Sequence, residues 1–516
     1  MADTKREIER KYESDESGLP DLTGVAGVAT VLDKGVAELD AVYYDTPDER
    51  LAAAGITLRR RTGGSDAGWH LKFPVSSGVR DEIRAPLSDD LPRDFAGLVR
   101  SRVREAELIP LVRLLSSRDV SDLLDADGTL LAEVSVDAVV AERLTDGGRT
   151  AQWSEIEVEL ADDGDPAFLT KVDKKLRKAG VRPSESPSKL ARALQETAPK
   201  KGKKVKKGKK SKQAGQRAEA AEEPGKPVTP ADHVLAYVRT QRDAIVDLDP
   251  AVRRDLFDSV HSMRVATRRL RSTFKSFGKV LDRTVTDPIG DELKWLAAEL
   301  GVDRDQEVLS ERLTAALDDL TEGLITGPVR TRLSTWAHSR GAGSRQRLIG
   351  VLDGERYLAL LESLDVLIAD PPLAKAAGGD PEKVLRKAVK RDLAKVEALI
   401  EEALAQPPGH ERSTAMHEAR KKAKRTRYAA EAAAPVLGKP AEHLVKDMKS
   451  LQTLLGDHQD SVMARETLRD IAFQAHEAGE SAFTYGILYG REERAAAAGE
   501  DELPGAWETV RARVAL

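Results

Sequence analysis

The stretch Arg6-Glu7-Ile8-Glu9-Arg10-Lys11-Tyr12 places acidic and basic residues at alternating positions. In a β-strand, side chains two positions apart share a face, so Glu7, Glu9 and Lys11 would project together. Two carboxylates and an ammonium group are unsuited to an apolar core, whereas they suit a site that holds a divalent cation beside an anion. At the start of a helix the same residues are ordinary surface charges, so the rest of the chain has to decide between the two interpretations.

Alternating charged faces recur in later segments of residues 1–197. Arg59 and Arg61 share a face, as do Glu82 and Arg84. Turn residues separate most of these segments, which comprise residues 42–46, 57–61, 69–73, 80–84, 130–137 and 154–160. The pattern predicts an antiparallel all-β unit, with a helical stretch over 167–179. In an open sheet the charged faces meet water, whereas in a closed barrel they point inward and line a tunnel.

A tunnel of this composition has a chemical use. Carboxylates on one wall would hold Mg²⁺ or Mn²⁺, which are hard cations that prefer oxygen ligands. Arg and Lys side chains elsewhere would neutralise the phosphate groups that such cations face. Unpaired charges cannot stay buried, so a lumen of this kind needs side chains of both signs and a charged ligand.

These residues resemble the CYTH superfamily, the triphosphate tunnel enzymes, whose ExExK signature matches Glu7-x-Glu9-x-Lys11. The resemblance covers about residues 1–197 and continues through the motifs Tyr44-Asp45-Thr46, Leu58-Arg59-Arg60-Arg61, Leu71-Lys72, Glu82-x-Arg84, Glu133 to Asp137, Glu155-x-Glu157-x-Glu159 and Ser188-Lys189. It implies an eight-stranded antiparallel β-barrel tunnel with flanking helices. The activity it implies is metal-dependent, in-line attack of water on a terminal phosphoryl group.

The same resemblance implies roles for particular residues. The catalytic candidates are Glu7, Glu9 and Lys11. The metal ligands would be Glu7, Glu9, Glu157 and Glu159, with Mg²⁺ or Mn²⁺ as the cofactor. The phosphate groups would contact Lys11, Arg59, Arg61, Lys72, Arg84 and Lys189, with Arg118 as a further candidate. Glu133 and Asp137 stand at even spacing, so either or both could face the lumen.

Composition restricts the class of protein. The chain has 516 residues, too many for a single core, and 33% of them are charged, with a formal net charge of −5. It has no cysteine, which excludes disulfides and thiolate metal sites. The first residues lack the apolar stretch of a secretory signal, and no run approaches the ~18 apolar residues of a membrane helix. We therefore expect a cytoplasmic protein without a membrane partner.

A change of composition at residues 198–228 predicts a disordered linker between two domains. Its first half contains nine lysines within the thirteen residues 200–212, and its second half is rich in Ala, Glu and Pro. Neither half can bury enough apolar surface to fold. The lysines serve either as a solvated spacer or as an accessory contact to a polyanion. They are not interleaved with aromatic residues that would stack on bases, so nucleic acid is not the expected partner.

From residue 229 onward apolar residues recur at helical spacing, and one pattern occurs twice. Two predicted helices carry a histidine and three cations on one stripe, at positions i, i+3, i+7 and i+10. They are His261, Arg264, Arg268 and Arg271 in the first and, 156 residues later, His417, Arg420, Lys424 and Arg427 in the second. A Leu-Gly-x-x-x-Asp motif follows each helix and ends at Asp305 or Asp460. This indicates a duplication, with one helical bundle in each copy, at about 229–370 and 371–512.

A single basic stripe is most often a solvated helix face. Two such stripes brought together across a pseudo-twofold axis would instead form one cationic surface for a long, densely charged anion. The histidines would then pack, donate hydrogen bonds to phosphate or, as the least favoured role, bind a metal. Asp305 and Asp460 would cap helices or orient the basic side chains.

These helices resemble the CHAD domain, a conserved histidine α-helical domain that often follows CYTH. The matching signatures are His261-x-x-Arg264 and His417-x-x-Arg420-Lys421, and the resemblance covers roughly 229–512. It implies a helical domain that binds inorganic polyphosphate. The binding residues would be His261, Arg264, Arg268, Arg271, His417, Arg420, Lys421, Lys424 and Arg427.

The sequence therefore predicts an α+β protein of two domains, a barrel over 1–197 and a helical domain of two pseudo-symmetric bundles over 229–512. Its predicted function is metal-dependent hydrolysis of inorganic tripolyphosphate or short polyphosphate in the tunnel. The helices would bind inorganic polyphosphate, in the cytoplasm and at polyphosphate granules. Three alternatives stay open: a CYTH-type adenylate cyclase, a thiamine or nucleoside triphosphatase, and a non-catalytic scaffold of polyphosphate granules. No oligomeric state is predicted.

Overall fold

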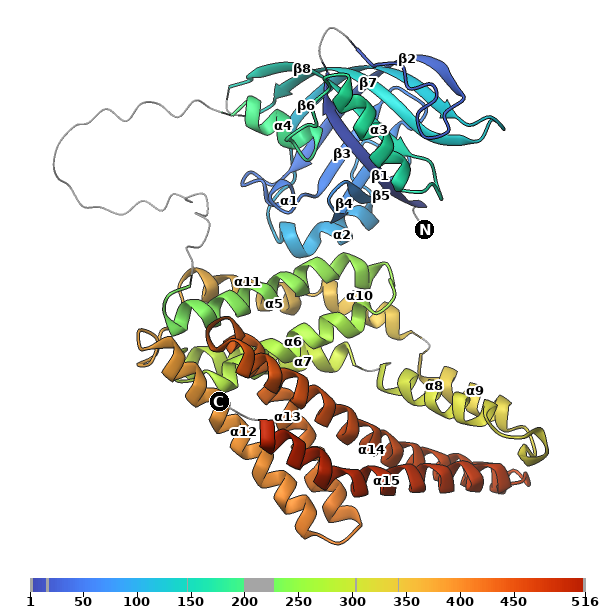
Figure 1. The fold of residues 1–516 in the computed structure, drawn as a ribbon, viewed down its shortest axis with the longest axis vertical. Helices are drawn as coiled ribbons and strands as arrows, with labels where there is room; N and C mark the ends of the chain where they lie inside the picture. The colour runs from blue at the N-terminus through green and yellow to red at the C-terminus, as the bar shows by residue number, and fades with distance from the viewer. Residues whose placement is uncertain are drawn as a thin grey trace, which may run out of the picture. The chain divides into compact units, whose positions relative to one another are not determined.

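The protein folds into two compact units, Met1–Gly215 and Gln216–Leu516, in the computed structural model shown in Figure 1. The structure describes residues 3–14, 18–145, 147–198, 227–301, 304–341 and 343–513, and only the backbone of residues 3, 304–305 and 338–341. The linker predicted at 198–228 lies outside the described residues, apart from its two ends. The two units are described separately below.

The N-terminal unit is a closed antiparallel barrel, as the sequence predicts, with the strand order β1-β5-β4-β3-β2-β6-β7-β8. Strand β1 closes it, because its first half pairs with β5 and its second half with β8. The strands are β1 (Asp3–Glu13), β2 (Thr30–Asp45), β3 (Thr57–Thr62), β4 (Gly68–Ser76), β5 (Val79–Ala85), β6 (Ile109–Leu124), β7 (Leu130–Arg143) and β8 (Thr150–Leu160).

The apolar side chains of these strands face outward and are covered by helices. Helices α1 (Arg50–Ala53) and α2 (Arg93–Val103) pack over β3, β4 and β5, where Leu58, Leu71 and Ile83 are buried. Helix α3 (Ala167–Lys178) covers β8 and its neighbours, and α4 (Lys189–Glu196) covers β6, β7 and β8. The hydrophobic core therefore lies between the barrel wall and the helices. The period of two then leaves the charged faces pointing into the lumen.

The C-terminal unit is helical, as predicted. Its α-helices are α5 (Pro230–Arg253), α6 (Ser259–Ser276), α7 (Arg283–Glu299), α8 (Arg304–Asp318), α9 (Val329–Gly341), α10 (Ser344–Asp353), α11 (Glu355–Ala369), α12 (Pro381–Ala405), α13 (His410–Leu437), α14 (Lys439–Glu477) and α15 (Phe483–Arg513). One short 3₁₀ helix, Glu322–Leu324, lies between α8 and α9.

The duplication is visible in the helices themselves. Helix α7 begins at Arg283 and α14 at Lys439, which is the same offset of 156 residues that separates the basic stripes. Where the first copy has two helices, α7 and α8, the second has the single long α14 (Figure 1). Helix α5 runs through Pro250 to Arg253. Arg253 pairs with buried Asp249 at 2.7 Å, and this contact ties the last turn together.

The two copies share their hydrophobic cores. The larger core combines α5, α6, α7 and α11 with α12, α13, the first part of α14 and the end of α15. A smaller one joins α8 and α9 to the end of α14 and the start of α15. Helices α6 and α13, which carry the basic stripes, meet directly within this arrangement. In the part of the chain that the structure describes, none of the helices is long and apolar enough to cross a membrane.

Candidate active site and basic cavity

The lumen of the barrel is a cavity of about 640 Å³ with strongly charged walls. It brings together every residue that the sequence predicts for this site: Glu7, Glu9, Lys11, Arg59, Arg61, Lys72, Arg84, Arg118, Glu157, Glu159 and Lys189. These side chains come from β1, β3, β4, β5, β6, β8 and the first residue of α4. The alternation seen in the sequence therefore corresponds to one continuous inner surface.

Strand β1 and strand β8 place their charges opposite one another. In this register Glu9 faces Glu159 and Lys11 faces Glu157. Lys11 forms a close ion pair with Glu157, and its ammonium lies 3.3 Å from Glu9. Burial lowers the pKa of Lys11, but Glu157 and Glu9 more than offset this, so its pKa stays above the ordinary value. Lys11 is therefore held as a cation between two strands of carboxylates.

The adjoining wall, formed by β5, β4 and β3, gathers cations around Glu82, a residue that the sequence prediction omitted. Lys72 Nζ lies 3.3 Å from Glu82 and 2.5 Å from Glu7. Arg84 forms a close ion pair with Glu82, and Arg59 lies 3.8 Å from it. Buried Glu82 thus fixes three predicted phosphate-binding side chains. Its place on the same strand face as Arg84 was the available signal.

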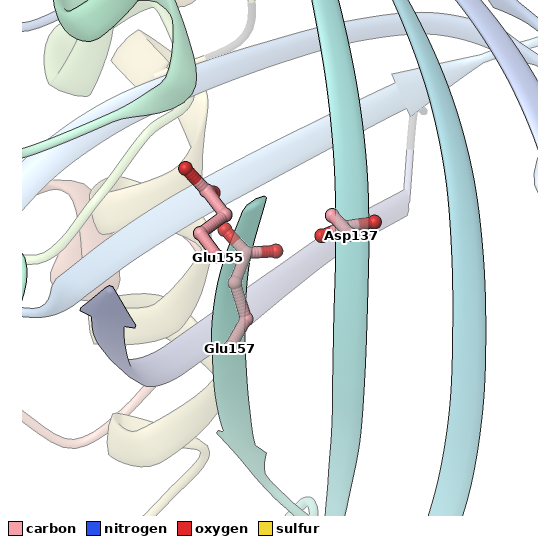
Figure 2. Close-up of side chains that lie close together, drawn as sticks. All are labelled: Asp137, Glu155 and Glu157. Atoms are coloured by element: carbon pink, nitrogen blue, oxygen red, sulfur yellow. The ribbon is translucent and has the colours of Figure 1, made fainter. Parts of the chain in front are cut away.

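A second set of buried charges lies between β7, β8 and α4. Asp137, Glu155 and Glu157 lie close together, with one ligand atom of each within 4.8 Å of the others, which is close enough to hold a metal ion (Figure 2). The Lys189 ammonium lies between them, at 3.0 Å from Asp137, 2.7 Å from Glu155 and 2.6 Å from Glu157. Arg118 adds contacts of 2.7 Å to Asp137 and 2.6 Å to Glu157. The protein itself thus balances these carboxylates.

The pKa values follow this pairing. Burial raises the pKa of Glu157, but Lys11, Lys189 and Arg118 together hold it well below the ordinary value. The pKa of Asp137 is likewise lowered, because Lys189 and Arg118 outweigh its burial. Both groups are therefore ionised at neutral pH, and Lys189 of α4 already serves as their cation.

Glu7 and Glu133 behave differently. Burial, together with Glu82 and Glu159, raises the pKa of Glu7 to about 7 against the opposing effect of Lys72. Burial and then Glu159 also raise the pKa of Glu133. These carboxylates repel one another in a buried place, and an added cation would relieve that repulsion. The carboxylates near Glu7 and Glu133 therefore suit a divalent metal ion better than do Asp137, Glu155 and Glu157, which surround Lys189.

The structure also separates Glu133 from Asp137, which the sequence could not. Both lie on β7, and Glu133 lines the lumen, whereas Asp137 is fully buried beneath Arg118 and Lys189. Their even spacing places both on the inner face, but only the position of α4 decides which one stays accessible. The sequence left open which of Glu133 and Asp137 faces the lumen, and it assigned no role to Glu155.

The helical unit contains a basic cavity of about 770 Å³ between α6 and α13, called the first basic cavity below. Eight of the nine residues predicted to bind polyphosphate line it: His261, Arg264, Arg268, Arg271, His417, Arg420, Lys421 and Lys424. The ninth, Arg427, is not part of this lining. It lies 3.3 Å from Glu431 and 4.9 Å from the centre of the Tyr428 ring.

Mutual repulsion of cations shapes the first basic cavity. Burial, together with the charges of Arg420, Arg268 and Arg264, lowers the pKa of Lys424 to about 7. Burial also lowers the pKa of Arg271. Asp460 lies 3.8 Å from Arg420, as its predicted orienting role requires, whereas the side chain of Asp305 lies outside the described residues. Cations held this close together favour a bound anion.

The glycine of each Leu-Gly-x-x-x-Asp motif leaves room for one of these arginines. A β-carbon at Gly456 would lie 2.9 Å from Nη2 of Arg420, and one at Gly301 would lie 2.6 Å from Nη2 of Arg264. Each guanidinium therefore rests against the bare backbone of the next helix. The repeat of this glycine was a signal in the sequence, although its purpose became apparent only from the packing.

Comparisons with known proteins agree with both halves. The family model of the CYTH domain matches residues 5–194, and that of the CHAD domain matches residues 236–469. Uncharacterized protein Rv2226 of Mycobacterium tuberculosis (strain ATCC 25618 / H37Rv) is 38% identical over 502 residues, which cover 94% of this chain and 92% of the relative.

Solved structures resemble each half. The CHAD domain from the plant Ricinus communis is 24% identical, with a TM-score of 0.42, and the match covers 59% of this chain and 97% of that one. A putative adenylyl cyclase from Hippeastrum that reveals a dominant triphosphatase activity is 17% identical, with a TM-score of 0.23. That match covers 38% of this chain and 98% of the other.

We predict that Lys189→Met destabilises the barrel by about 3–5 kcal/mol at neutral pH, because it leaves three buried carboxylates without their shared cation. In the parent, the lowered pKa values of Asp137 and Glu157 stabilise the folded barrel at pH values above the ordinary carboxyl pKa. This stabilisation is lost as pH falls. In the variant these pKa values rise, so protonation relieves the penalty. The difference between parent and variant should therefore shrink toward about pH 4.

Hydrogen exchange of the barrel amides measures this free energy of unfolding without a contribution from the helical unit. Lys174→Met on the exposed face of α3 is the matched control, and it should change stability by less than about 0.5 kcal/mol. Equal stability of Lys189→Met and the parent at neutral pH would contradict the assigned pairing.

Proposed function

Because this chain belongs to the family of proteins in which a CYTH domain is followed by a CHAD domain, we propose that its barrel hydrolyses inorganic tripolyphosphate and short inorganic polyphosphate. The supporting observation is the composition of the lumen. Many carboxylates and cations line it beside aliphatic residues, and among the described lining residues Tyr43 is the one aromatic. The hydroxyl of Tyr43 accepts a hydrogen bond from Arg59 at 3.2 Å.

This lining favours a bare phosphate chain over an organic triphosphate. A nucleoside or thiamine group would gain from a flat aromatic surface beside the phosphates, and Tyr43 is instead buried and held by Arg59. The cations of β3, β4 and β5 offer repeated charge along one wall. A linear inorganic chain uses all of that charge, with Arg side chains able to bind two oxygens each.

The barrel's own residues supply positioning and charge stabilisation. Arg59, Arg61 and Lys72 would bind the terminal phosphoryl group and the one next to it. They would stabilise the charge that develops on the transferring oxygens as water attacks in line. Lys11, fixed by Glu157 and Glu9, would bind the same group from the β1 side. Buried ion pairs to Glu7 and Glu82 hold Lys72 in place before the substrate arrives.

The CYTH family is metal-dependent, and Mg²⁺ or Mn²⁺ is the proposed cofactor. Glu7, Glu9, Glu157 and Glu159 would hold it, and the ion would polarise phosphoryl oxygens and neutralise their charge. The raised pKa of Glu7 and the accessible position of Glu133 support a metal position near Glu159, at one end of this set of carboxylates. Glu157 is already paired with three cations, so it contributes least.

We further propose that the helical unit binds inorganic polyphosphate in the first basic cavity. Residues on α6 and α13 supply its cations, and the lowered pKa of Lys424 reflects their crowding. Such a surface binds a densely charged anion without reading bases. The protein would then be found at polyphosphate granules in the cytoplasm.

We expect Glu7→Gln/Glu9→Gln to lower phosphate release from tripolyphosphate about a hundredfold or more. The change removes two carboxylates from the metal-side wall, and stabilisation worth several kcal/mol is lost with them. Release of orthophosphate by the purified full-length protein, with and without Mn²⁺, is the measurement. Glu142→Gln, an exposed position on β7, is the matched control and should behave as the parent.

The same assay separates the alternatives. Cyclic AMP formed from ATP without orthophosphate would identify an adenylate cyclase. Faster hydrolysis of thiamine triphosphate or of a nucleoside triphosphate than of tripolyphosphate would identify that compound as the preferred substrate. Equal release by Glu7→Gln/Glu9→Gln and the parent would contradict the assigned site.

We also predict that polyphosphate binding by the helical unit takes up a proton above pH 7. The lowered pKa of Lys424, about 7, leaves it largely neutral at higher pH in the free protein. Bound phosphate favours the charged form and raises that pKa, so affinity should fall by up to about tenfold per pH unit as pH rises from about 7 to 9.

Calorimetric titrations in two buffers of different ionisation enthalpy measure the proton uptake. Lys424→Met should abolish the proton uptake that comes from this lysine, whereas Lys446→Met on the exposed face of α14 should retain that uptake. Equal proton uptake by Lys424→Met and the parent would show that Lys424 does not face the anion.

A further inference from the structure

A second basic pocket of about 570 Å³ lies beside the first basic cavity in the helical unit. Seven residues line it, and all but one of them are cations: Lys275, Gly278, Lys279, Arg283, Arg391, Lys395 and Arg425. They come from the end of α6, the turn that follows it, the start of α7, the middle of α12 and the middle of α13. The basic stripes predicted from the sequence include none of these residues.

The second basic pocket and the first basic cavity adjoin each other. Lys275 and Arg425 line both of them. The cationic surface therefore continues past these two side chains, from the stripe on α6 and α13 toward α12. An anion that is long enough can contact both spaces at once.

The arginines of the second basic pocket are held in fixed positions. Arg425 Nη2 donates to the carbonyl oxygen of Lys275 at 2.6 Å, and Arg391 Nη2 donates to that of Ser276 at 2.6 Å. Asp392, only 2% exposed, accepts a hydrogen bond from Ser276 Oγ at 2.6 Å and lies 3.2 Å from Arg425. Backbone carbonyls and one buried carboxylate thus orient these guanidinium groups in advance, and such preorganisation favours ligand binding.

The local charge is unbalanced. Asp392 also pairs with Arg391 at 3.4 Å and with Lys395 at 3.6 Å, so one carboxylate is shared by three cations. Burial lowers the pKa of Lys275, and Arg271 and Arg425 lower it further, although Asp291 and Asp287 oppose this. The cations crowd one another, and a bound anion would relieve that repulsion.

Gly278 contributes to the shape of the second basic pocket. A β-carbon there would lie 2.8 Å from Cδ and 2.9 Å from Cγ of Arg283. The absence of a side chain at this turn lets the aliphatic part of Arg283 lie against the backbone, where its guanidinium reaches the pocket. Arg283 also lies 2.7 Å from Asp287 on the same helix.

The duplication provides an internal comparison. The offset of 156 residues relates Lys275 to Glu431 in the second copy. Glu431 accepts hydrogen bonds from Tyr237 at 2.8 Å and Arg269 at 3.1 Å, and Arg427 lies 3.3 Å from it. The related place is thus occupied by the protein's own carboxylate. The second basic pocket, which residues of both copies line, therefore differs from the place that the repeat relates to it.

We propose that the second basic pocket binds the phosphate groups of a polyphosphate chain that extends from the first basic cavity past Lys275 and Arg425. This rests on the proposed binding of polyphosphate by the helical unit. The second basic pocket then lengthens the contact with the chain and makes the protein favour long polyphosphate over short.

The test removes three cations that line only the second basic pocket, in the variant Lys279→Ala/Arg283→Ala/Lys395→Ala of the full-length protein. The matched control is Lys439→Ala/Lys446→Ala/Lys449→Ala, which removes the same charge from exposed positions on α14. Affinity for long-chain inorganic polyphosphate and for tripolyphosphate is measured over a range of salt concentrations. Circular dichroism confirms that each variant is folded.

We expect the variant to bind long polyphosphate about tenfold more weakly, with a salt slope smaller by about two to three, and to bind tripolyphosphate in the first basic cavity as the parent does. Equal losses in variant and control would overturn the proposal, because net charge alone would then explain them. Loss of one bound tripolyphosphate with unchanged affinity for long polyphosphate would also overturn it, since the pocket would then hold a separate anion. If the parent binds no polyphosphate, the proposed function of the helical unit fails, and the pocket's role fails with it.

Discussion

Burial of charge inside the barrel is the constraint on which the N-terminal structure depends. The strands turn their apolar faces outward to the helices, so their charged faces must share a closed lumen. An isolated charge in such a place costs several kcal/mol, and each buried residue therefore needs a partner of opposite sign or a ligand. The lumen meets this requirement in two ways. Around Lys189 the protein supplies both signs, whereas burial and neighbouring carboxylates raise the pKa values of Glu7 and Glu133.

This difference assigns separate tasks to the two groups of carboxylates. The buried triad around Lys189 attaches α4 to the barrel wall and keeps Arg118 and Lys11 in place, so it is part of the scaffold. Near Glu7, burial and the carboxylates of Glu82 and Glu159 raise the pKa, and a divalent metal ion would relieve the repulsion between these carboxylates. Proximity of carboxylates alone would have selected the triad as the metal site, but the charges around it favour the other wall.

The helical unit uses the opposite imbalance. Its basic side chains crowd together on α6, α12 and α13, and burial together with this crowding lowers the pKa values of Lys424 and Lys275. Packing of the large apolar core holds these helices together despite that repulsion. A bound polyanion would relieve the repulsion between these cations, and this relief would contribute to the free energy of binding. The paired stripes repeat at an offset of 156 residues, but the same offset relates Lys275 to Glu431, so the two sides are unequal.

The sequence by itself determined the barrel, the helical repeat and most of the candidate site. Periods of two and of 3.6 residues are local properties, so they fix which face of a strand or helix Glu7, Arg59, Arg264 and Arg420 occupy. Only the tertiary structure decided that Asp137 is buried under Lys189 while Glu133 stays in the lumen, that Arg427 turns to Glu431, and that a second basic pocket forms. These outcomes depend on segments that lie far apart in the chain, such as α4 against β7 and α12 against α6. Spacing within one segment carries no information about which distant charge will lie opposite, because that is set by how the apolar faces pack.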